Sequence, residues 1–247
     1  MAGGCQHAVR MRLPYFPLHV VAFPRMPLPL HIFEERYRLM TADLVADDSP
    51  FDGRLVIAKI TSGSESGSED EPQTETVGTV VQVRRAEQFA DGRWALVTVG
   101  VDRVTLGGVD HSGPYAVVEV TQLPDNPGRG AGSLVPVVQE ALDTYLSTLR
   151  TFLTDGDAFG GQPSETAEVM GRLERLLRRL RLPRDPVAAS YAVAGLLQIE
   201  LSRKQRLLEM PDAASRLRAE LGLLHREAEL IGDSSLAPMT ALTEYRN

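Results

Sequence analysis

The sequence predicts an α+β protein in which a β-rich amino-terminal part with one helix is followed by a helical bundle. Hydrophobic residues alternate with polar ones along residues 13–123, as in half-buried strands, and recur every three or four positions after residue 133, as in helices. The intervening segment PDNPGRGAGS is rich in glycine and proline, which favours a linker. We therefore expect a flexible amino terminus at 1–12, a β-rich domain at 13–123, a linker at 124–133, a helical bundle at 134–232 and a flexible tail at 233–247.

Four segments of the amino-terminal part have the character of strands. They are LVIAKI (55–60), TVGTVVQVRRAEQF (76–89), WALVTVGVDRVTL (94–106) and YAVVEVTQL (115–123). Asp91-Gly92 lies between the second and the third, and this dipeptide is typical of the type I′ turn of a β-hairpin. The Ser-, Gly- and acid-rich stretch 62–75 has nothing to bury, so we expect a solvated, mobile loop there.

The opening segment LPYFPLHVVAFPRMPLPLHIFEERYRLM (13–40) combines an extended chain with a helix. Its prolines cannot donate to a central sheet ladder, so strands here should lie at an edge or be short and bulged. Phe33, Tyr37 and Met40 share helical spacing, which predicts an amphipathic helix over 33–46. Glu34 and Arg38 stand four residues apart, and we interpret them as a structural ion pair rather than an acid–base site.

Beyond the linker, apolar stripes predict four or five short helices. They include 134–153, 164–181, a helix that reaches about residue 200, and the residues after Pro211. Asp185-Pro186 is a capping residue followed by proline at the first helical position, which opens the third of these. In the last, Leu217, Leu221 and Leu224 form a seam that we expect to pack against the helix at 164–181.

Charge and composition exclude several classes of protein. The net charge of −7 argues against a nucleic-acid-binding protein, because phosphates must be faced by a surplus of cations. Cys5 is the only cysteine, so no internal disulfide can form. No run approaches the ~18 apolar residues that suggest a membrane span, and residues 1–12 lack the apolar segment of a signal peptide. We expect a soluble, cytoplasmic protein that binds neither DNA nor a membrane.

Several separated segments carry a resemblance to a known family. PLHIFEERYR, LVIAKI and TVGTVVQVRR follow one another in the order and spacing of the substrate-binding domain of the Lon proteases. WALVTVGVDRVTL resembles the strand that ends in that family's glycine-x-x-arginine segment, and residues 201–230 resemble its closing helices. The resemblance implies a strongly bent, PUA-like β pseudo-barrel followed by a helical bundle, with polypeptide recognition as the function.

The catalytic parts of a complete Lon protease are not expected here. Its ATPase needs a phosphate-binding loop G-x-x-x-x-G-K-[ST], and neither Lys59 nor Lys204, the two lysines of the chain, stands in that context. Its serine–lysine dyad belongs to a further domain, no G-x-S-x-G elbow occurs, and the histidines lack the grouping of zinc ligands. We therefore predict no catalytic residue, no metal and no cofactor, and a chain that holds the recognition module alone.

One stretch is a candidate for binding polypeptide. Phe23, Met26 and Leu28 lie in a proline-stiffened loop, which limits the entropy lost when such a loop engages a partner. Extended polypeptides are recognised by a sheet edge together with apolar pockets. Trp94 follows the hairpin turn and covers either the core or the same groove. The alternative for Phe23 and Met26 is that they fill the core of the domain.

These observations predict a non-catalytic, adaptor-like protein that binds an unfolded or partner polypeptide. The alternative is a small-ligand or RNA-binding PUA-like module, which a basic groove would favour over an apolar one. An enzyme is the third class, which the sequence disfavours because it has no nucleophile, base and orienting group at plausible spacing. The sequence leaves a homo-oligomer open.

Overall fold

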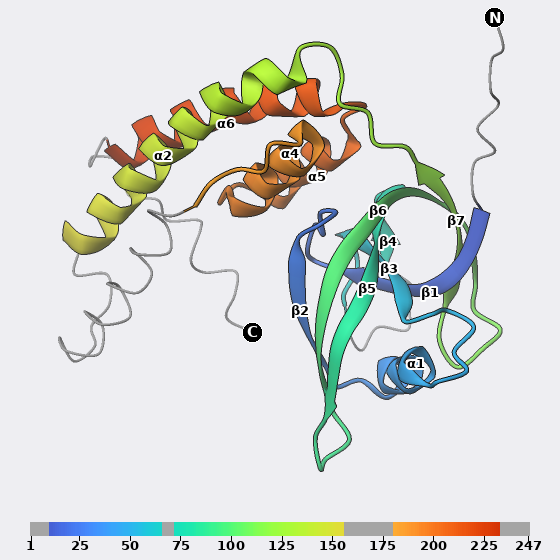
Figure 1. Cartoon of the computed structure of the whole chain (residues 1–247). Helices are drawn as coiled ribbons and strands as arrows, with labels where there is room; N and C mark the ends of the chain where they lie inside the picture. Colours follow the sequence, from blue (N-terminus) through green and yellow to red (C-terminus); the bar gives the residue numbers. More distant parts are fainter. Residues whose placement is uncertain (1–9, 66–71, 156–179, 233–247) are drawn as a thin grey trace, which may run out of the picture. The chain divides into compact units, whose positions relative to one another are not determined.

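The computed structural model describes residues 10–65, 72–155 and 180–232 of the chain and shows a mixed α/β protein (Figure 1). Its contacts divide the chain into two compact units, each described by itself below. The first unit ends at Asp125 and also contains Glu200–Met210. The second unit contains Asn126–Ile199 and the residues from Pro211 onward.

The first unit is built on a seven-stranded sheet. The strands are β1 (Arg10–Leu18), β2 (Pro27–Ile32), β3 (Arg54–Ser62), β4 (Gln73–Thr74), β5 (Val77–Gln88), β6 (Trp94–Asp110) and β7 (Val117–Leu123). They pair in the order β1-β7-β6-β5-β3-β4, while β2 pairs with β6. An additional parallel pairing of β1 with β3 closes five of these strands into a ring, and the other strand pairs are antiparallel.

The two proline-containing strands differ in their place in this sheet. β2 pairs with β6 alone, as expected for an edge strand. The expectation is wrong for β1, which pairs with β7 along Arg10–Pro14 and with β3 along Tyr15–Leu18. Because β1 changes partner after Pro14, its prolines do not interrupt one continuous central ladder.

Both faces of β3 are buried, which explains its unbroken apolar run. Leu55 and Ile57 belong to one core cluster, and Val56 and Ala58 belong to another. Helix α1 (Glu35–Val45) adds Tyr37, Met40 and Leu44 to the first cluster. Phe33, expected on the same helical stripe, precedes the helix and is exposed.

Two local expectations in this unit are wrong in detail. The β5–β6 hairpin lies where Asp91-Gly92 predicts it, but among the non-glycine residues described only Arg25 and Asp52 have positive φ, so the turn is not type I′. Instead Gly92 alone takes the left-handed conformation, with φ +83°, and its N–H donates to the Phe89 carbonyl. Within the expected loop at 62–75, Gln73–Thr74 form β4, and residues 66–71 lie outside the described part.

Helix α5 (Leu201–Glu209) belongs to the first unit, although the sequence places it in the helical bundle. Gln205 is buried and donates to the Val77 carbonyl of β5 at 3.0 Å. Arg103 of β6, 3% exposed, donates to the carbonyls of Leu208 (2.8 Å) and Met210 (2.7 Å). Since these contacts depend on side chains far apart in the sequence, helical periodicity could not assign the helix to its unit.

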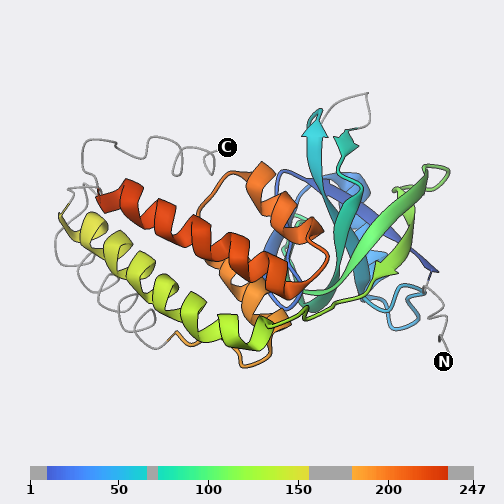
Figure 2. The same ribbon diagram turned by 90° about the horizontal axis from the view of Figure 1, so that it is seen from above.

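The second unit contains α2 (Ala131–Asp155), α4 (Pro186–Leu196) and α6 (Ala213–Gly232). Helices α2 and α6 run side by side along their length, and α4 packs on both (Figure 2). The cap at Asp185 is confirmed, because its carboxylate accepts hydrogen bonds from the N–H groups of Val187 and Ala188.

The seam predicted on the last helix is partly confirmed. Leu217 and Leu224 are fully buried, whereas Leu221 is half-buried. The expected partner helix at 164–181 lies almost wholly outside the described residues. In the described part of the chain, no helix is both long and apolar enough to cross a membrane.

Candidate polypeptide-binding surface

The outer face of β2 and β6 displays apolar side chains because both strands alternate. In β2 the side chains of Leu28, Leu30 and Ile32 pack toward the core, and those of Pro27, Pro29 and His31 are exposed. Pro29 lies opposite Val97 of β6, and His31 lies opposite Ala95.

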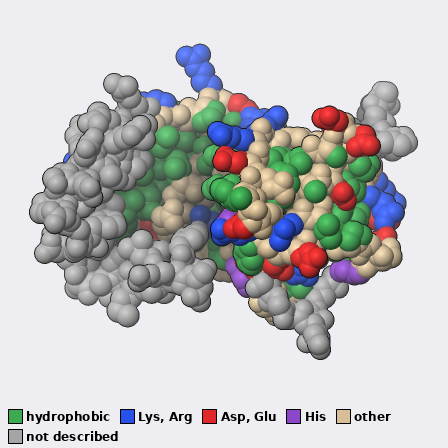
Figure 3. Space-filling model, turned by 90° about the horizontal axis from the view of Figure 1, so that it is seen from below, with side chains coloured by type: hydrophobic (Ala, Val, Ile, Leu, Met, Phe, Trp, Pro, Cys, Tyr) green, Lys and Arg blue, Asp and Glu red, His purple; other side chains and the backbone are tan. Residues whose placement is uncertain are grey.

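Three large apolar side chains stand out on this face. Phe33 is 58% exposed, Val97 44% and Phe89 41%. The His31 ring joins the two phenylalanines edge-on, with centroid distances of 6.5 Å to Phe33 and 6.1 Å to Phe89. We call His31, Phe33, Phe89 and Val97 the outer-face patch. Figure 3 shows hydrophobic side chains exposed among charged ones on one face of the molecule.

A paired arginine borders the patch at Phe89. The Arg93 guanidinium lies 6.0 Å from the centre of the Phe89 ring and is bonded to Asp91 at 2.7 Å. Hydrogen bonds from Arg93 hold the pKa of Asp91 below its ordinary value.

The predicted ion pair of Glu34 with Arg38 is wrong. Glu34 pairs with Arg36 at 3.1 Å. The physical reason is that Glu34 is the residue before the helix, with an extended ψ of 141°, so its side chain is not set on the helix face at the spacing that Arg38 requires.

The residues proposed from the sequence lie mostly beneath the surface. Phe23 is 3% exposed, so the expectation that it is a solvent-facing anchor is wrong and the alternative of a core residue holds. Leu28 and Trp94 are half-buried and pack against the first core cluster. Met26 is half-buried. A binding role for Met26, Leu28 and Trp94 remains a prediction.

Phe23 is buried because main-chain hydrogen bonds hold its loop against β6. Arg25 N–H donates to the Gly100 carbonyl at 2.7 Å, and Gly100 N–H donates to the Met26 carbonyl at 3.0 Å. A Cβ atom at Gly100 would overlap the Phe23 carbonyl, so only glycine permits this approach.

The free side of β2 is a poor template for another strand. The Gly100 N–H donates to the Met26 carbonyl, and in an antiparallel pair every second residue directs its backbone N–H and C=O toward the partner strand. Counting from Met26, the residues of β2 that face β6 in this way are Leu28, Leu30 and Ile32. Pro27, Pro29 and His31 direct theirs to the other side, where the two prolines have no N–H to offer. Recognition on this face therefore depends on side chains more than on strand addition.

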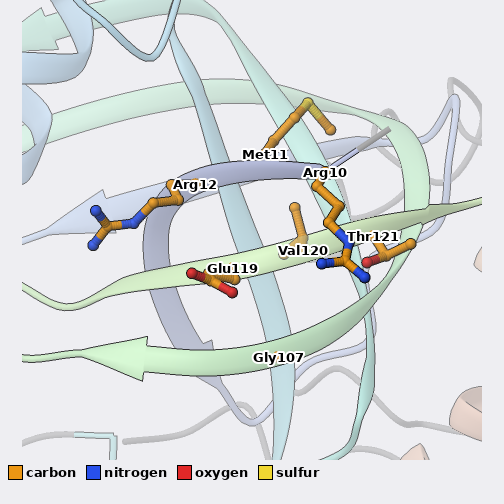
Figure 4. Close-up of a pocket in the computed structure, with 7 residues that line it drawn as sticks. All are labelled: Arg10, Met11, Arg12, Gly107, Glu119, Val120 and Thr121. Atoms are coloured by element: carbon orange, nitrogen blue, oxygen red, sulfur yellow. The ribbon is translucent and has the colours of Figure 1, made fainter. Parts of the chain in front are cut away.

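A hollow of about 450 Å³ lies on the sheet over β1, β6 and β7. Figure 4 shows its lining: Arg10, Met11, Arg12, Gly107, Glu119, Val120 and Thr121. Arg12 pairs there with Asp110, whose pKa is lowered to about 2, first by hydrogen bonds from Ser112 and then by Arg12. The charged groups lining it are exposed, so this hollow offers less apolar contact than the outer-face patch.

No group of three His, Cys, Asp or Glu side chains in the described residues is arranged to hold a metal ion.

Two solved structures have the same fold as this chain. The amino-terminal domain of the Lon protease of the Mycobacterium avium complex superposes with a TM-score of 0.54 at 20% identity, covering 87% of this chain and 98% of that one. A Lon N-terminal domain protein from Xanthomonas campestris gives 0.54 at 21% identity, with 86% and 98% covered. The fold is thus that of Lon amino-terminal domains.

Comparison of the sequence with known families assigns the chain to a family. The family model of the ATP-dependent protease La (LON) substrate-binding domain matches residues 12–226, and the chain belongs to this family. Curated relatives include the Lon proteases of Escherichia coli K12, 24% identical over 230 residues, and of Trichlorobacter lovleyi, 28% identical over 224 residues. The matches cover 92% and 89% of this chain but 26% and 24% of those proteins, so the chain spans about a quarter of their length.

Proposed function

We propose that this chain is a non-catalytic, adaptor-like module of the cytoplasm that binds polypeptide segments on the outer-face patch. The observation that supports it most is the cluster of exposed rings at Phe33 and Phe89 joined through His31. Exposed contiguous apolar surface favours an interaction site, and aromatic side chains provide large contact areas at low entropic cost. The substrate-binding description of the family agrees with this role.

We also propose that the two units are a PUA-like pseudo-barrel and a helical bundle. The closed ring of strands supports a pseudo-barrel of the PUA-like kind, and the packing of α2, α4 and α6 supports a helical bundle. The net charge of −7 and the apolar patch favour polypeptide over RNA as the ligand.

The proposal is tested by replacing Phe33 and Val97 together with serine and measuring the binding of a fluorescently labelled unfolded polypeptide by anisotropy. The Kd should rise by about tenfold or more, because burial of one such side chain contributes roughly 1.5–3 kcal/mol and 1.4 kcal/mol corresponds to a factor of ten. Thermal unfolding should stay close to that of the parent, since both side chains are exposed.

The matched control is Val137→Ser on α2, where an equally exposed valine (47%) lies in the second unit. Its Kd should equal that of the parent chain. A folded Phe33→Ser/Val97→Ser variant with unchanged Kd would show that polypeptide does not bind at this patch.

A further inference from the structure

Arg38 is an arginine whose guanidinium has no hydrogen-bond or ion-pair partner among the described residues. Only its main chain forms a hydrogen bond among these residues, from its N–H to the Glu34 carbonyl at 2.9 Å. Of the two carboxylates one helical turn before it, Glu34 is bound by Arg36, and no ion pair joins Glu35 to Arg38 in the described part of the chain. The side chain is half-buried on α1, so its positive charge is partly withdrawn from water without a counter-charge from any residue that the structure describes.

The guanidinium of Arg38 lies against the tip of the β5–β6 hairpin. A Cβ atom at Gly92 would overlap it, so the Gly92 main chain and the arginine are in close contact. Gly92 closes the same turn as Phe89, to whose carbonyl its N–H donates at 2.9 Å. Helix α1 also contacts β2 and β5. Arg38 therefore lies beside the turn that carries Phe89, one of the four residues of the outer-face patch.

Other arginines near the patch have carboxylate partners. Arg93 is bound by Asp91, Arg36 by Glu34, and Arg85, which lies opposite Val97, by Glu87. Arg38 offers a charge that no described residue matches. A planar guanidinium presents paired donors that fit a carboxylate, and such charge-assisted bonds are the strong ones.

We propose that Arg38 selects the ligand of the patch: an extended polypeptide segment in which an Asp or Glu side chain adjoins a large apolar residue. This inference rests on the proposed function. The apolar residue contacts the outer-face patch while the carboxylate binds Arg38. Side-chain selection of this kind suits an edge where Pro27 and Pro29 remove main-chain donors.

The test uses the full chain and two labelled, unstructured peptides that differ at one position, with Glu or Gln next to a phenylalanine. The parent chain should bind the Glu peptide about tenfold more tightly at low ionic strength. Arg38→Gln should bind both peptides as the parent binds the Gln peptide, and Arg38→Lys should recover part of the preference. Arg226→Gln, at an exposed arginine of α6, should keep the full preference.

Equal affinity of the parent chain for the two peptides would overturn the inference while leaving polypeptide binding in place. An undiminished preference in Arg38→Gln would also overturn it, and thermal unfolding of each variant verifies that the chains compared are folded. If neither peptide nor the unfolded polypeptide binds the parent chain, the proposed function fails together with the inference.

Discussion

Arg103 and Arg38 carry the same side chain in opposite surroundings. The Arg103 guanidinium is buried and bonds to the carbonyls of Leu208 and Met210 as well as to the Asp125 carboxylate at 3.3 Å. These carbonyls and the carboxylate accept hydrogen bonds from the Arg103 guanidinium, so Arg103 has a structural role. Arg38 has no such set of acceptors within the described chain, which leaves it available to an incoming carboxylate.

Glu220 on α6 carries a buried carboxyl group in the second unit. It is fully buried, neither of its oxygens has a hydrogen-bond partner in the described structure, and burial raises its pKa well above the ordinary value of 4.5 despite the opposing effect of Arg216. Arg216 itself lies 4.1 Å from the centre of the Tyr191 ring and donates to the Ser190 hydroxyl at 2.9 Å.

The raised pKa of Glu220 gives the free energy of unfolding a defined dependence on pH. The unfolded chain releases this proton near pH 4.5, whereas the folded chain retains it. The contribution of Glu220 to stability is therefore fully present below pH 4.5 and is lost as the pH rises through the folded pKa. Glu220→Gln should unfold with a free energy at least about 1 kcal/mol higher than the parent at pH 8, and equal to it near pH 4.

Urea denaturation at the two pH values measures this difference. Glu229→Gln, at an exposed position of the same helix, is the control and should change stability by less than about 0.5 kcal/mol at either pH. A Glu220→Gln variant that is less stable than the parent at pH 8 would show that the carboxylate is stabilised by a partner.

At the scale of single residues, the sequence could indicate chemistry but not exposure. The alternation of β2 places His31 on the outer face, and the same alternation extended by one step would have identified Phe33 there. The sequence instead predicts Phe33 on a helical stripe, since its spacing to Tyr37 is helical and the helix start at Glu35 has no strong capping signal. Phe23 could not be placed because its burial depends on the approach of Gly100, which is distant in sequence.

At the scale of elements, periodicity predicted strands and helices well and their partners poorly. Short apolar runs and alternation located β3, β5, β6 and β7, because period-two alternation is a local property. The change of partner along β1 and the pairing of β4 with β3 are set by contacts that no local pattern records.

One buried side chain, Arg103, bonds to the carboxyl-terminal end of helix α5. The chain leaves the first unit after Asp125 and again after Met210, and Arg103 bonds to both segments. Arg103→Met should lower the free energy of unfolding by about 3 kcal/mol or more, because each buried carbonyl left without a donor costs roughly 1–3 kcal/mol.

In Arg103→Met, hydrogen–deuterium exchange should show reduced protection first in the amides of residues 201–209. Arg12→Met removes an arginine whose side chain is 58% exposed and pairs with Asp110, and it should cost less than about 1 kcal/mol. Unchanged exchange in α5 of Arg103→Met would mean that Gln205 and the buried leucines hold the helix without the guanidinium.

At the scale of the whole molecule, the chain has the fold of Lon amino-terminal domains and matches the substrate-binding family over residues 12–226. That relationship was accessible from the sequence, since separated motifs agreed in order. The location of the proposed binding surface was not, because the exposed rings of Phe33 and Phe89 come together around His31 only after β2 and the β5–β6 hairpin are folded side by side.

The central claim is that polypeptide contacts the outer-face patch, and site-specific photo-crosslinking tests it most directly. A photoreactive amino acid is placed at Val97 in one variant and at Val137 in another, each valine being similarly exposed in the parent chain. Irradiation with an excess of a labelled unfolded polypeptide should give a covalent adduct at position 97 that unlabelled polypeptide competes away, and little adduct at position 137. Equal labelling at both positions, or none at position 97 while the polypeptide remains bound, would contradict the claim.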